Sequence, residues 1–492
     1  MTTKLSLSNL ASLPTRVARP NYDRSALKAG ILHFGVGNFH RAHQAVYLDD
    51  LFGLGLGHDW ALVGAGVFDD EKANREKLKE QDWLTTVVEQ DEGHMSARVT
   101  ASMVDFVTPG DAASIIARLA DPAIKIVSLT ITEGGYFIDP ASGNFDPAHP
   151  AIVADARNPG APKTVFGLIL AGLVRRRADG VVPFTVMSCD NIPHNGRVTS
   201  DGVVGLARLI DEGLAAWVGE HVAFPNSMVD RITPATSERE RAILAQEFGV
   251  EDNWPVFCEP FRQWVLEDRF TDGRPPLEKV GVQFVSDVSP YELMKIRILN
   301  GGHAAIAYPA GLMDIHFVHE AMAEPLVRGF LDKIEHDEII PTVPPVPDTS
   351  LEDYYRLIDK RFSNPKIGDT VRRLCLDGSN RQSKFIIPTI ADRLKAKKGV
   401  AGLALESALW CRYCFGTTDS GAAIEPNDPN WARMQATAAA AKDDPAAWLA
   451  MDDIYGEVGR SEVFASAFAH ALAALWAHGA RTTLTRYLAG TP

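Results

Sequence analysis

A lysine, an asparagine and a histidine lie close together in one stretch of the chain, residues 291–309, with the sequence YELMKIRILNGGHAAIAYP. If this stretch is a helix, each residue turns the chain by about 100°, so Lys295 and His303 share one face and Asn300 lies at its edge. An ammonium, an amide and an imidazole would then point into one space, where Gly302 leaves room for a ligand. The stretch therefore predicts a polar cluster on a rigid element, of the kind that proton transfer and the binding of a charged oxygen require.

The ends of this helix can also be predicted. Ser289 precedes a proline, which is typical of an N-cap followed by proline in the first turn, and Pro309 is expected to end the helix. A purely structural interpretation stays open, in which Lys295 extends to water, Asn300 caps a kink and His303 is a hydrogen-bonded core residue. The choice between the two depends on what the rest of the chain brings to this face.

The length and composition of the chain limit the classes of protein to which it can belong. Its 492 residues exceed the size at which one hydrophobic core usually keeps growing, so two domains are expected. The apolar share of 46% and the charged share of 23% are those of a globular protein with an ample core. The net charge of -14 argues against a nucleic acid or an acidic membrane surface as partner, because both require clustered cations. We therefore expect a small-molecule partner.

The five cysteines are too few and too scattered for a disulfide framework, and they favour a reducing compartment. Cys411 and Cys414 form a single CxxC motif inside an apolar run, which indicates helix packing rather than a metal site. The N-terminus lacks the charged segment and apolar core of a signal peptide, and no run approaches the ~18 apolar residues of a membrane span. We expect a cytoplasmic protein with no membrane partner and no metal.

A glycine-rich turn follows the first apolar strand candidate, residues 30–34. The turn has the sequence GVGNFHRAHQ over residues 35–44 and leads into a helical pattern, so strand, turn and helix occur in the order of a dinucleotide-binding unit. Glycines there let backbone N–H groups approach a pyrophosphate at the helix N-terminus. The third glycine of the usual pattern is a histidine here, and packing of a tight turn explains the pattern equally well. The candidate cofactor-binding residues are Gly35, Val36, Gly37, Asn38, Phe39 and Arg41.

The second strand candidate, residues 60–67, is followed closely by Asp69. In a dinucleotide-binding unit, a carboxylate at this place binds the ribose hydroxyl groups and repels a 2′-phosphate. Asp69 therefore favours NAD over NADP. On local grounds it is equally well explained as the N-cap of the helix that follows it.

Polar residues also follow two later strand candidates. Glu133 follows the strand over residues 124–131, and Asn191 follows the strand over residues 181–188. Open α/β sheets bind ligands at the carboxyl ends of their strands, although both residues can also be turn formers. Further strands are expected at residues 83–88, 97–104, 227–232 and 279–285, and helices at 112–119 and 165–177.

The character of the sequence changes at Pro290, since helical patterns dominate from there to Leu488. We therefore expect a domain boundary near residue 286. The patterns predict an α/β domain over residues 1–286, which would bind the dinucleotide, and a mainly α-helical domain over residues 287–492, which would bind the substrate.

Four segments of the chain resemble the polyol-specific long-chain dehydrogenases, which are the mannitol dehydrogenase family. They are HFGVGNFHRAHQ at 33–44, SLTITEGGY at 128–136, FPNSMVDRITP at 224–234 and MKIRILNGGH at 294–303. The third is similar to the signature stretch of the family, and the fourth contains its K-x4-N-x2-H arrangement. The resemblance implies an NAD-dependent, metal-independent enzyme, usually monomeric, with a Rossmann-type N-terminal domain and a mainly α-helical C-terminal domain.

The resemblance also implies roles for individual residues. Lys295 matches the general base of the family, while Asn300 and His303 match residues that hold the substrate oxygen. Asn191 matches a second asparagine that stabilises the alkoxide, and Glu133 matches an acid linked to proton exit. The residues at substrate-binding positions are Asp230, Arg373, Arg381 and Lys384. Arg381 stands where the family has a lysine.

Oxidation of a secondary alcohol by hydride transfer requires a neutral base within hydrogen-bond reach of the hydroxyl group. A free lysine has a pKa of roughly 10.4, but burial or a neighbouring cation such as Arg373 can lower it, and fixed amides such as those of Asn191 and Asn300 can stabilise the alkoxide. The reaction expected from the resemblance is the NAD-dependent oxidation of a polyol to a ketose, D-mannitol to D-fructose. Two alternatives stay open: a uronate oxidoreductase of the same family, which would need an extra cation for the substrate carboxylate, and a non-catalytic NAD-binding sensor.

Overall fold

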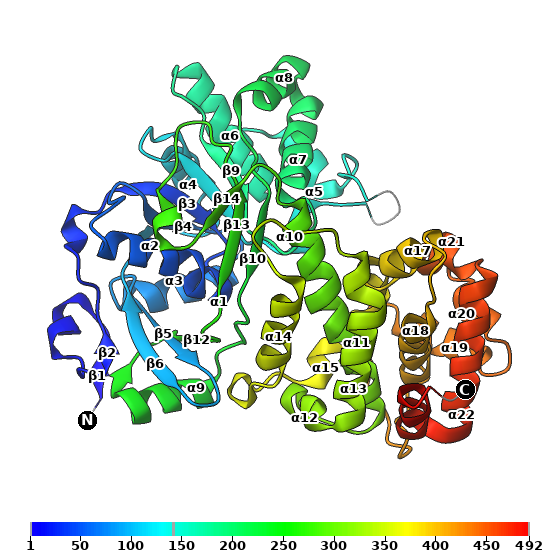
Figure 1. The fold of residues 1–492 in the computed structure, drawn as a ribbon. Coiled ribbons are helices and arrows are strands. Elements are labelled where there is room, and N and C mark those ends of the chain that lie inside the picture. The colour runs from blue at the N-terminus through cyan, green and yellow to red at the C-terminus, as the bar shows by residue number, and fades with distance from the viewer. Residues whose placement is uncertain (1, 140–142, 491–492) are drawn as a thin grey trace. The chain divides into compact units, whose positions relative to one another are not determined.

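The computed structural model describes residues 2–139 and 143–490. This part of the chain forms two compact units that divide between Val288 and Ser289, coloured blue to green and green to red in Figure 1. The first unit contains sheets flanked by helices, and the second consists mainly of helices. The predicted combination of an α/β domain with a mainly α-helical domain is confirmed.

A parallel sheet of five strands organises the first unit. The strand order is β7-β4-β3-β8-β9, and every neighbouring pair is parallel. The strands are β3 (Ala29–Phe34), β4 (Ala61–Ala65), β7 (Met103–Phe106), β8 (Ile126–Leu129) and β9 (Thr185–Ser188). This is the order of a doubly wound dinucleotide-binding sheet, in which the direction of winding reverses between the first strand and the fourth. Here that reversal lies between β3 and β8.

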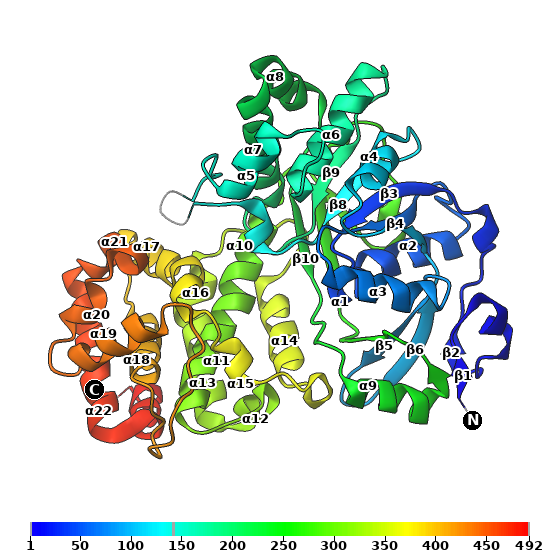
Figure 2. The same cartoon turned by 180° about the vertical axis from the view of Figure 1, so that it is seen from behind.

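The strands of this sheet present side chains to a hydrophobic core on each face. On β3, Leu32 belongs to one core and Ile31 to the other. The first core is completed by α4 (Ala112–Ala120), α6 (Val165–Ala178) and α7 (Asn195–Ile210), which Figure 2 shows near β8 and β9, and the second by α2 (Gln44–Gly53). Strands covered on both faces read as continuous apolar runs, and this is why they can be predicted from the sequence.

Smaller sheets complete the described part of the first unit. Their orders are β12-β5-β6-β2, β10-β13-β14 and β1-β11. Their strands include β1 (Thr3–Lys4), β2 (Val17–Ala18), β5 (Thr85–Gln90), β10 (Ser227–Asp230) and β11 (Val250–Glu251). β5, which overlaps the strand expected over residues 83–88, pairs antiparallel with β6 (Met95–Thr100) to form a hairpin.

One predicted strand is in fact two. Residues 97–104 are divided between β6 and β7, which lie in different sheets. The chain leaves β6 at Ala101, whose backbone N–H donates to the carboxylate of Asp49 at 2.9 Å. An acceptor from a distant helix thus interrupts an apolar run that the sequence shows as continuous.

The second half of the unit departs from the sequence prediction in two further ways. Residues 279–285 begin in a 3₁₀ turn, η5 (Leu277–Val280), and only then form β14 (Gln283–Val285). The strands β12 (Val256–Cys258) and β13 (Gln263–Glu267) are not predicted at all. Runs of three and five residues are too short to show a periodic pattern.

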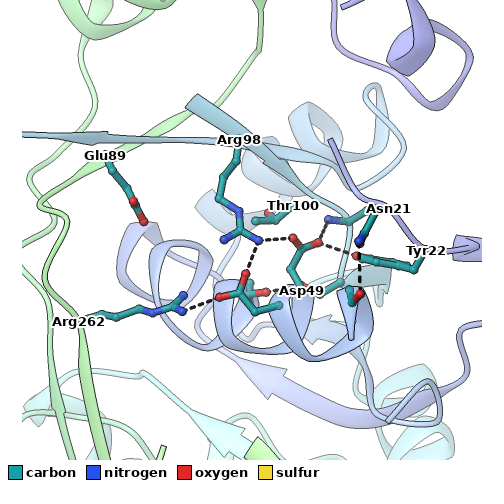
Figure 3. A network of polar contacts seen from close by, with 12 residues as sticks. Asn21, Tyr22, Asp49, Glu89, Arg98, Thr100 and Arg262 are labelled. Carbon is teal, nitrogen blue, oxygen red and sulfur yellow. Dashed lines mark hydrogen bonds and ion pairs between the residues drawn. The ribbon is translucent and has the colours of Figure 1, made fainter. Parts of the chain in front are cut away.

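A network of charged side chains fastens α2 to β6 (Figure 3). The guanidinium of Arg98 on β6 lies 2.6 Å from the carboxylate of Asp49 and 2.6 Å from that of Asp50, both on α2. Tyr22 donates to Asp49 at 2.6 Å, and Arg262 pairs with Asp50 at 2.5 Å. Because Asp49 is buried, its charge depends on these partners.

The second unit is built around one continuous helical segment. It runs from α10 (Ser289–Met294) through the π-helix η6 (Lys295–Asn300) to α11 (Gly301–Leu312). The prediction that Pro309 ends this helix is wrong, because α11 continues for three residues beyond it. Pro309 has no N–H to donate to the carbonyl of Ala305, so the helix passes through it with one α-helical hydrogen bond missing.

Other helices of the second unit pack around α11. In chain order they are α12 (Val318–Ala323), α13 (Pro325–Ile334), the π-helix η7 (Glu335–Ile339), α14 (Leu351–Phe362), α15 (Val371–Leu374), α16 (Gly378–Phe385), α17 (Ile387–Lys395), α18 (Ala401–Cys414), α19 (Trp431–Ala441), α20 (Ala446–Leu449), α21 (Asp452–Gly459) and α22 (Glu462–Leu488). α13, α15 and α18 contact α11 directly. Cys411 and Cys414 are buried on α18.

The helix α22 is long and apolar enough, by length and composition alone, to cross a membrane. Its backbone leaves the helical conformation at Gly479, where φ is 75° and ψ is 173°. Phe464, Phe468 and Leu472 are buried along it, and the helix packs against α18. A helix that packs in a protein core can meet the same criterion of length and composition as a helix that crosses a membrane.

Candidate active site

The glycine turn begins at the carboxyl end of β3, where the winding of the sheet reverses. Gly35 has a φ of 91°, and a Cβ atom on it would lie 2.0 Å from the carbonyl oxygen of Thr130, so a glycine is required. Val36 is buried, and Gly37 is the N-cap of α1 (Asn38–Ala42). The turn therefore occupies the crevice at which sheets of this topology bind dinucleotides.

Arg41 braces the turn from within the protein. Its guanidinium is fully buried and donates to the carbonyl oxygen of Gly37 at 3.2 Å and to the side chain of Asn38 at 2.7 Å. It also donates to the carbonyl oxygen of Trp254 and lies 3.7 Å from the centroid of that ring. Burial lowers the pKa of Arg41 to about 9, so the group stays cationic at neutral pH.

Two stacked histidines explain why the turn lacks its third glycine. The ring of His40 lies 3.7 Å from the ring of His33 on β3, and the rings are almost parallel. His33 is held by the hydroxyl groups of Ser128 at 2.8 Å and Thr130 at 3.0 Å. Burial lowers the pKa of His33 to about 3 and that of His40 well below its usual value. In place of the close helix–strand contact that a glycine allows, two neutral rings fill the space.

Asp69 stands beyond the end of β4 and is exposed. Its carboxylate makes no capping hydrogen bond to α3 (Asp70–Lys79) and instead pairs with Lys72 at 2.7 Å. That hydrogen bond is the main reason why the pKa of Asp69 lies below its usual value. Glu71 accepts hydrogen bonds from the backbone N–H groups of Val67 and Phe68, at 2.8 Å each. The carboxylate of Asp69 is therefore exposed to solvent beyond the carboxyl end of β4, with Lys72 as its ion-pair partner.

Three expected site residues of the first unit stand at the ends of strands. Glu133 opens the 3₁₀ turn η3 (Glu133–Tyr136) after β8, and Asn191 follows β9. Since β8 and β9 are parallel neighbours, the structure brings these two residues to one edge of the sheet. Asp230 is buried at the end of β10, in a different sheet.

In the second unit, a π-helix sets the relative direction of Lys295 and Asn300. These residues are the first and last of η6. In an α-helix, residues five apart point about 140° away from each other, but the wider, i→i+5 bonded turn of a π-helix brings them closer in direction. The expectation of a uniform α-helix is therefore wrong, and the correction moves Asn300 from the edge of the face toward Lys295. Lys295 is 7% exposed and Asn300 is 8% exposed.

The space beside Gly302 is occupied by protein. A Cβ atom on Gly302 would lie 3.1 Å from Oε1 of Glu335 and 3.5 Å from the ring of Phe362. The expectation that this glycine leaves room for a ligand is therefore wrong. Glu335 is fully buried, and burial raises its pKa well above the usual value. Gly302 thus makes room for the buried carboxyl group of Glu335.

His303 is held as a neutral imidazole. Its ring stacks on that of Phe362, with the centroids 4.3 Å apart. Burial is the main cause that lowers the pKa of His303 well below its usual value, and the charges of Arg373, Arg361, Arg381 and Lys295 add to the effect. A neutral ring can donate from one nitrogen and accept at the other. It is therefore suited to a hydrogen bond with an alcohol or a ketone.

The cationic residues expected to bind substrate are partly engaged by protein groups. Arg373 forms a forked contact with the carboxylate of Asp369. Arg381 donates to the carbonyl oxygen of Leu374 at 3.0 Å and to that of Arg373 at 3.4 Å. Lys384 is exposed at the end of α16. The structure thus brings Arg373 and Arg381 together within the electrostatic reach of His303.

Among the residues that the structure describes, no group of three histidine, cysteine, aspartate or glutamate side chains is placed to hold a metal ion. The second unit carries a lysine, an amide and a neutral imidazole on one continuous helical segment, at Lys295, Asn300 and His303. These are groups that can accept a proton and stabilise an alkoxide.

Comparisons with known proteins define the family. The model of the mannitol dehydrogenase Rossmann domain matches residues 29–279, and that of the mannitol dehydrogenase C-terminal domain matches residues 287–476. A curated mannitol 2-dehydrogenase of Cereibacter sphaeroides is 62% identical over 474 residues, which cover 96% of this chain and 99% of that protein. The chain belongs to the mannitol dehydrogenase family.

Solved structures of the family agree with this assignment. The structure of Pseudomonas fluorescens mannitol 2-dehydrogenase in a ternary complex with NAD and D-mannitol has a TM-score of 0.90 and 43% identity, with full coverage of both chains. A substrate-free D-sorbitol dehydrogenase has a TM-score of 0.89 and 36% identity and covers 98% of this chain. The family resemblance, the oxidoreductase class and the Rossmann domain expected from the sequence are confirmed for this member of the mannitol dehydrogenase family.

Several residues that shape this mannitol dehydrogenase site escape sequence reasoning. Gln382 on α16 donates to Glu406 on α18 at 2.5 Å, and burial raises the pKa of Glu406 to about 8. This buried pair anchors the helix that carries Arg381. Glu335 and His33 are further examples. For Glu406 and His33 the available signal is a polar residue inside an otherwise apolar run, which identifies a buried polar side chain but not its partner, whereas Gln382 and Glu335 stand in polar stretches that give no such signal.

Proposed function

We propose that this protein catalyses the NAD-dependent oxidation of D-mannitol to D-fructose, and that related polyols such as D-arabinitol and D-glucitol are secondary substrates. One observation carries the proposal: the full-length likeness to a mannitol 2-dehydrogenase whose structure holds NAD and D-mannitol. The placement of Lys295 and Asn300 at the two ends of one π-helix supports it from this chain itself.

The two units have different roles in the proposed reaction. The first unit, residues 1–286 in the sequence prediction, binds NAD, and the second, residues 287–492, carries the catalytic base. The residues fit the cofactor, because a Cβ atom on Gly37 would have no neighbour closer than the carbonyl oxygen of Gly35 at 3.8 Å, which leaves the turn open for close approach, and Asp69 offers an exposed carboxylate for ribose hydroxyl groups. Gly37, Asn38 and Phe39 would line the turn, with Val36 and Arg41 supporting it from within.

Lys295 is the general base of the proposed reaction. In its neutral form it takes the proton of the substrate hydroxyl group as the carbinol carbon loses its hydride. NAD, when bound, supplies the nicotinamide ring that accepts this hydride. Asn300 and Asn191 donate hydrogen bonds to the alkoxide as it develops, and the neutral ring of His303 holds the same oxygen. Glu133 conducts the proton away from the site. The remaining hydroxyl groups of the substrate contact Asp230, Arg373, Arg381 and Lys384.

A uronate oxidoreductase is the second candidate, and the neighbouring guanidinium groups of Arg373 and Arg381 favour it. A carboxylate substrate needs a cation that is available for a bidentate contact. Arg373 already holds the carboxylate of Asp369, and Arg381 donates to backbone carbonyl groups. A neutral polyol therefore suits these two residues better. A sensor without turnover would have no need of Lys295 beside Asn300.

Turnover of a substrate panel, followed by NADH absorbance, tests the proposal. The purified protein is expected to reduce NAD with D-mannitol and to oxidise NADH with D-fructose, with weaker activity on D-arabinitol and D-glucitol. Turnover of a uronate without activity on any hexitol or pentitol would establish the second candidate. NADH binding without turnover of any of these compounds would leave the sensor.

The exposed carboxylate of Asp69 is expected to select NAD over NADP. Replacing Asp69 with alanine should lower the ratio of kcat/KM for NAD to that for NADP by roughly 10-fold or more, since hydrogen bonds to a charged group contribute about 1.5–3 kcal/mol. The same change frees the ammonium of Lys72, 2.7 Å away, to attract a 2′-phosphate. Asp70→Ala, at the neighbouring exposed position, is the matched control and should leave the ratio unchanged. If both variants keep the ratio of the unmodified protein, another residue selects the cofactor.

We further propose that the protein acts as a cytoplasmic monomer on a small neutral substrate. The sparse and unpaired cysteines support a reducing compartment. The net charge of -14 supports a partner other than nucleic acid.

A further inference from the structure

The loop that carries Glu133 is held by a carboxylate from the neighbouring strand end. Asp190, which follows β9, accepts hydrogen bonds from the backbone N–H groups of Ile131 and Thr132, at 2.9 Å each. It accepts a third from the hydroxyl group of Tyr136 at 2.6 Å. The donors all come from the segment between the end of β8 and the end of η3. One side chain of the β9 loop therefore sets the conformation of the β8 loop.

The backbone that these hydrogen bonds hold is strained. Thr132 has φ of 64° and ψ of 164°, a region that is essentially restricted to glycine, and a β-branched side chain makes it more costly. Such a conformation persists only where surrounding contacts over-determine it. The contacts that hold Thr132 are the hydrogen bonds from the backbone N–H groups of Ile131 and Thr132 to the carboxylate of Asp190. Thr132 directly precedes Glu133, so its backbone angles set where Glu133 begins.

The same loop is tied to a third strand end. The side-chain amide of Asn195 donates to the backbone carbonyl of Asp190 at 3.0 Å and to that of Ser227 at 2.8 Å. The N–H of Ser227 donates back to Asn195 at 2.9 Å, and its hydroxyl group donates to the carbonyl of Ser188 at 2.6 Å. Ser227 begins β10, the strand that ends at Asp230. The network thus connects the ends of β8 and β9 with β10.

We propose that Asp190 is a positioning residue for the oxidation of the polyol: by holding Thr132 in its strained conformation, it fixes Glu133 relative to Asn191, its own neighbour in the chain. This inference rests on the proposed function, because it assigns Asp190 to the reaction through those two residues. A displacement of about 1 Å at a reacting group can cost 10²-fold in rate. The hydrogen bonds of Asp190 to Ile131, Thr132 and Tyr136, which we call the clamp, can therefore change the reaction rate without contact with the substrate.

The replacement Asp190→Asn tests the clamp with little change of volume. An amide retains one acceptor oxygen. In place of the second carboxylate oxygen it has an NH₂ group, which cannot accept the hydrogen bond that this oxygen accepted. Thr132 is then expected to relax out of the glycine region and to carry Glu133 with it. We expect kcat for D-mannitol to fall by about 10²-fold, while the Kd for NADH and the KM for D-mannitol each change by less than about threefold.

A second replacement separates positioning from general damage. Glycine adopts the backbone angles of Thr132 without steric cost, so Thr132→Gly alone should keep kcat within about threefold. Combined with Asp190→Asn, it should restore kcat by at least about 10-fold over Asp190→Asn alone, since the loop no longer needs the carboxylate to stay in place. Asp179→Asn, an exposed residue at the end of α6, is the matched control and should leave all values unchanged.

Hydrogen–deuterium exchange gives a readout that does not depend on turnover. In the unmodified full-length protein, the amides of Ile131 and Thr132 are expected to exchange slowly, and Tyr136→Phe, which removes one of the three bonds, should accelerate them. If these amides exchange as fast as free loops, the clamp does not exist. If they are protected but the double variant is no more active than Asp190→Asn, Asp190 is structural only and the inference is overturned. An absence of polyol turnover in the unmodified protein, with protected amides, would instead overturn the proposed function.

Discussion

Replacing Lys295 with alanine is expected to lower kcat for D-mannitol oxidation by roughly 10²- to 10⁴-fold, the usual contribution of a general base. The Kd for NADH should change by less than about threefold, because the base contacts the substrate and not the adenine half of the cofactor. The structure strengthens the reason for this expectation. Lys295 is 7% exposed and shares a π-helix with Asn300, so a side chain that extends freely into water does not describe it.

The identity of the missing function can be tested by chemical rescue. A small primary amine should restore part of the activity of Lys295→Ala, and the rescue should increase as the pH rises toward the pKa of the amine, since only the neutral amine accepts a proton. His303 does not contribute to the pH dependence of the rescue, because its pKa lies well below the usual value and the ring stays neutral.

Lys333 provides the matched control for the lysine replacement. It lies on α13 in the same unit and pairs with Asp337 at 3.0 Å, with its side chain 38% exposed. Lys333→Ala should leave kcat, KM and the NADH affinity unchanged. If the folded Lys295→Ala variant has the same kcat as Lys333→Ala, Lys295 is not the general base and the proposed mechanism is wrong.

Replacing Arg98 with methionine is expected to have the largest effect on stability. Methionine keeps much of the side-chain volume but leaves Asp49, which is 4% exposed, without its guanidinium partner (Figure 3). Removing one member of a buried ion pair costs about 3–5 kcal/mol, and the lower figure applies here because Arg98 is 26% exposed. In a unit of this size, roughly 3 kcal/mol lowers Tm by about 6–12 °C. Thermal unfolding followed by circular dichroism measures the shift.

An exposed arginine of the same unit serves as control for this measurement. Arg208 pairs with Glu212 at 3.6 Å, and both side chains are more than half exposed. Arg208→Met should change the free energy of unfolding by about 0–1 kcal/mol, as is usual for surface pairs. Equal shifts in Tm for the two variants would contradict the view that the Arg98 network fastens α2 to β6.

The sequence by itself determined the class of each domain and the order along the chain of most strands in the parallel sheet. The apolar runs of β3, β4, β8 and β9 are continuous because both faces of the sheet are covered, and the glycine turn after β3 marks the start of a dinucleotide-binding unit. Four short motifs in order were enough to indicate the family, which the comparisons confirm. These features are local, since each depends on residues that are neighbours in the chain.

The tertiary structure alone decided what each polar residue faces. Lys295 and Asn300 lie at the two ends of a π-helix, whose wider turn brings residues five apart closer in direction than an α-helix does, and the sequence carries no periodic signal that distinguishes one such turn from an α-helix. The space at Gly302 belongs to Glu335, thirty-three residues further along the chain. The strained turn at Thr132 depends on Asp190 from another strand. Each of these outcomes rests on a partner distant in the chain or on a change in backbone bonding, whereas patterns of neighbouring residues report only local preference and burial.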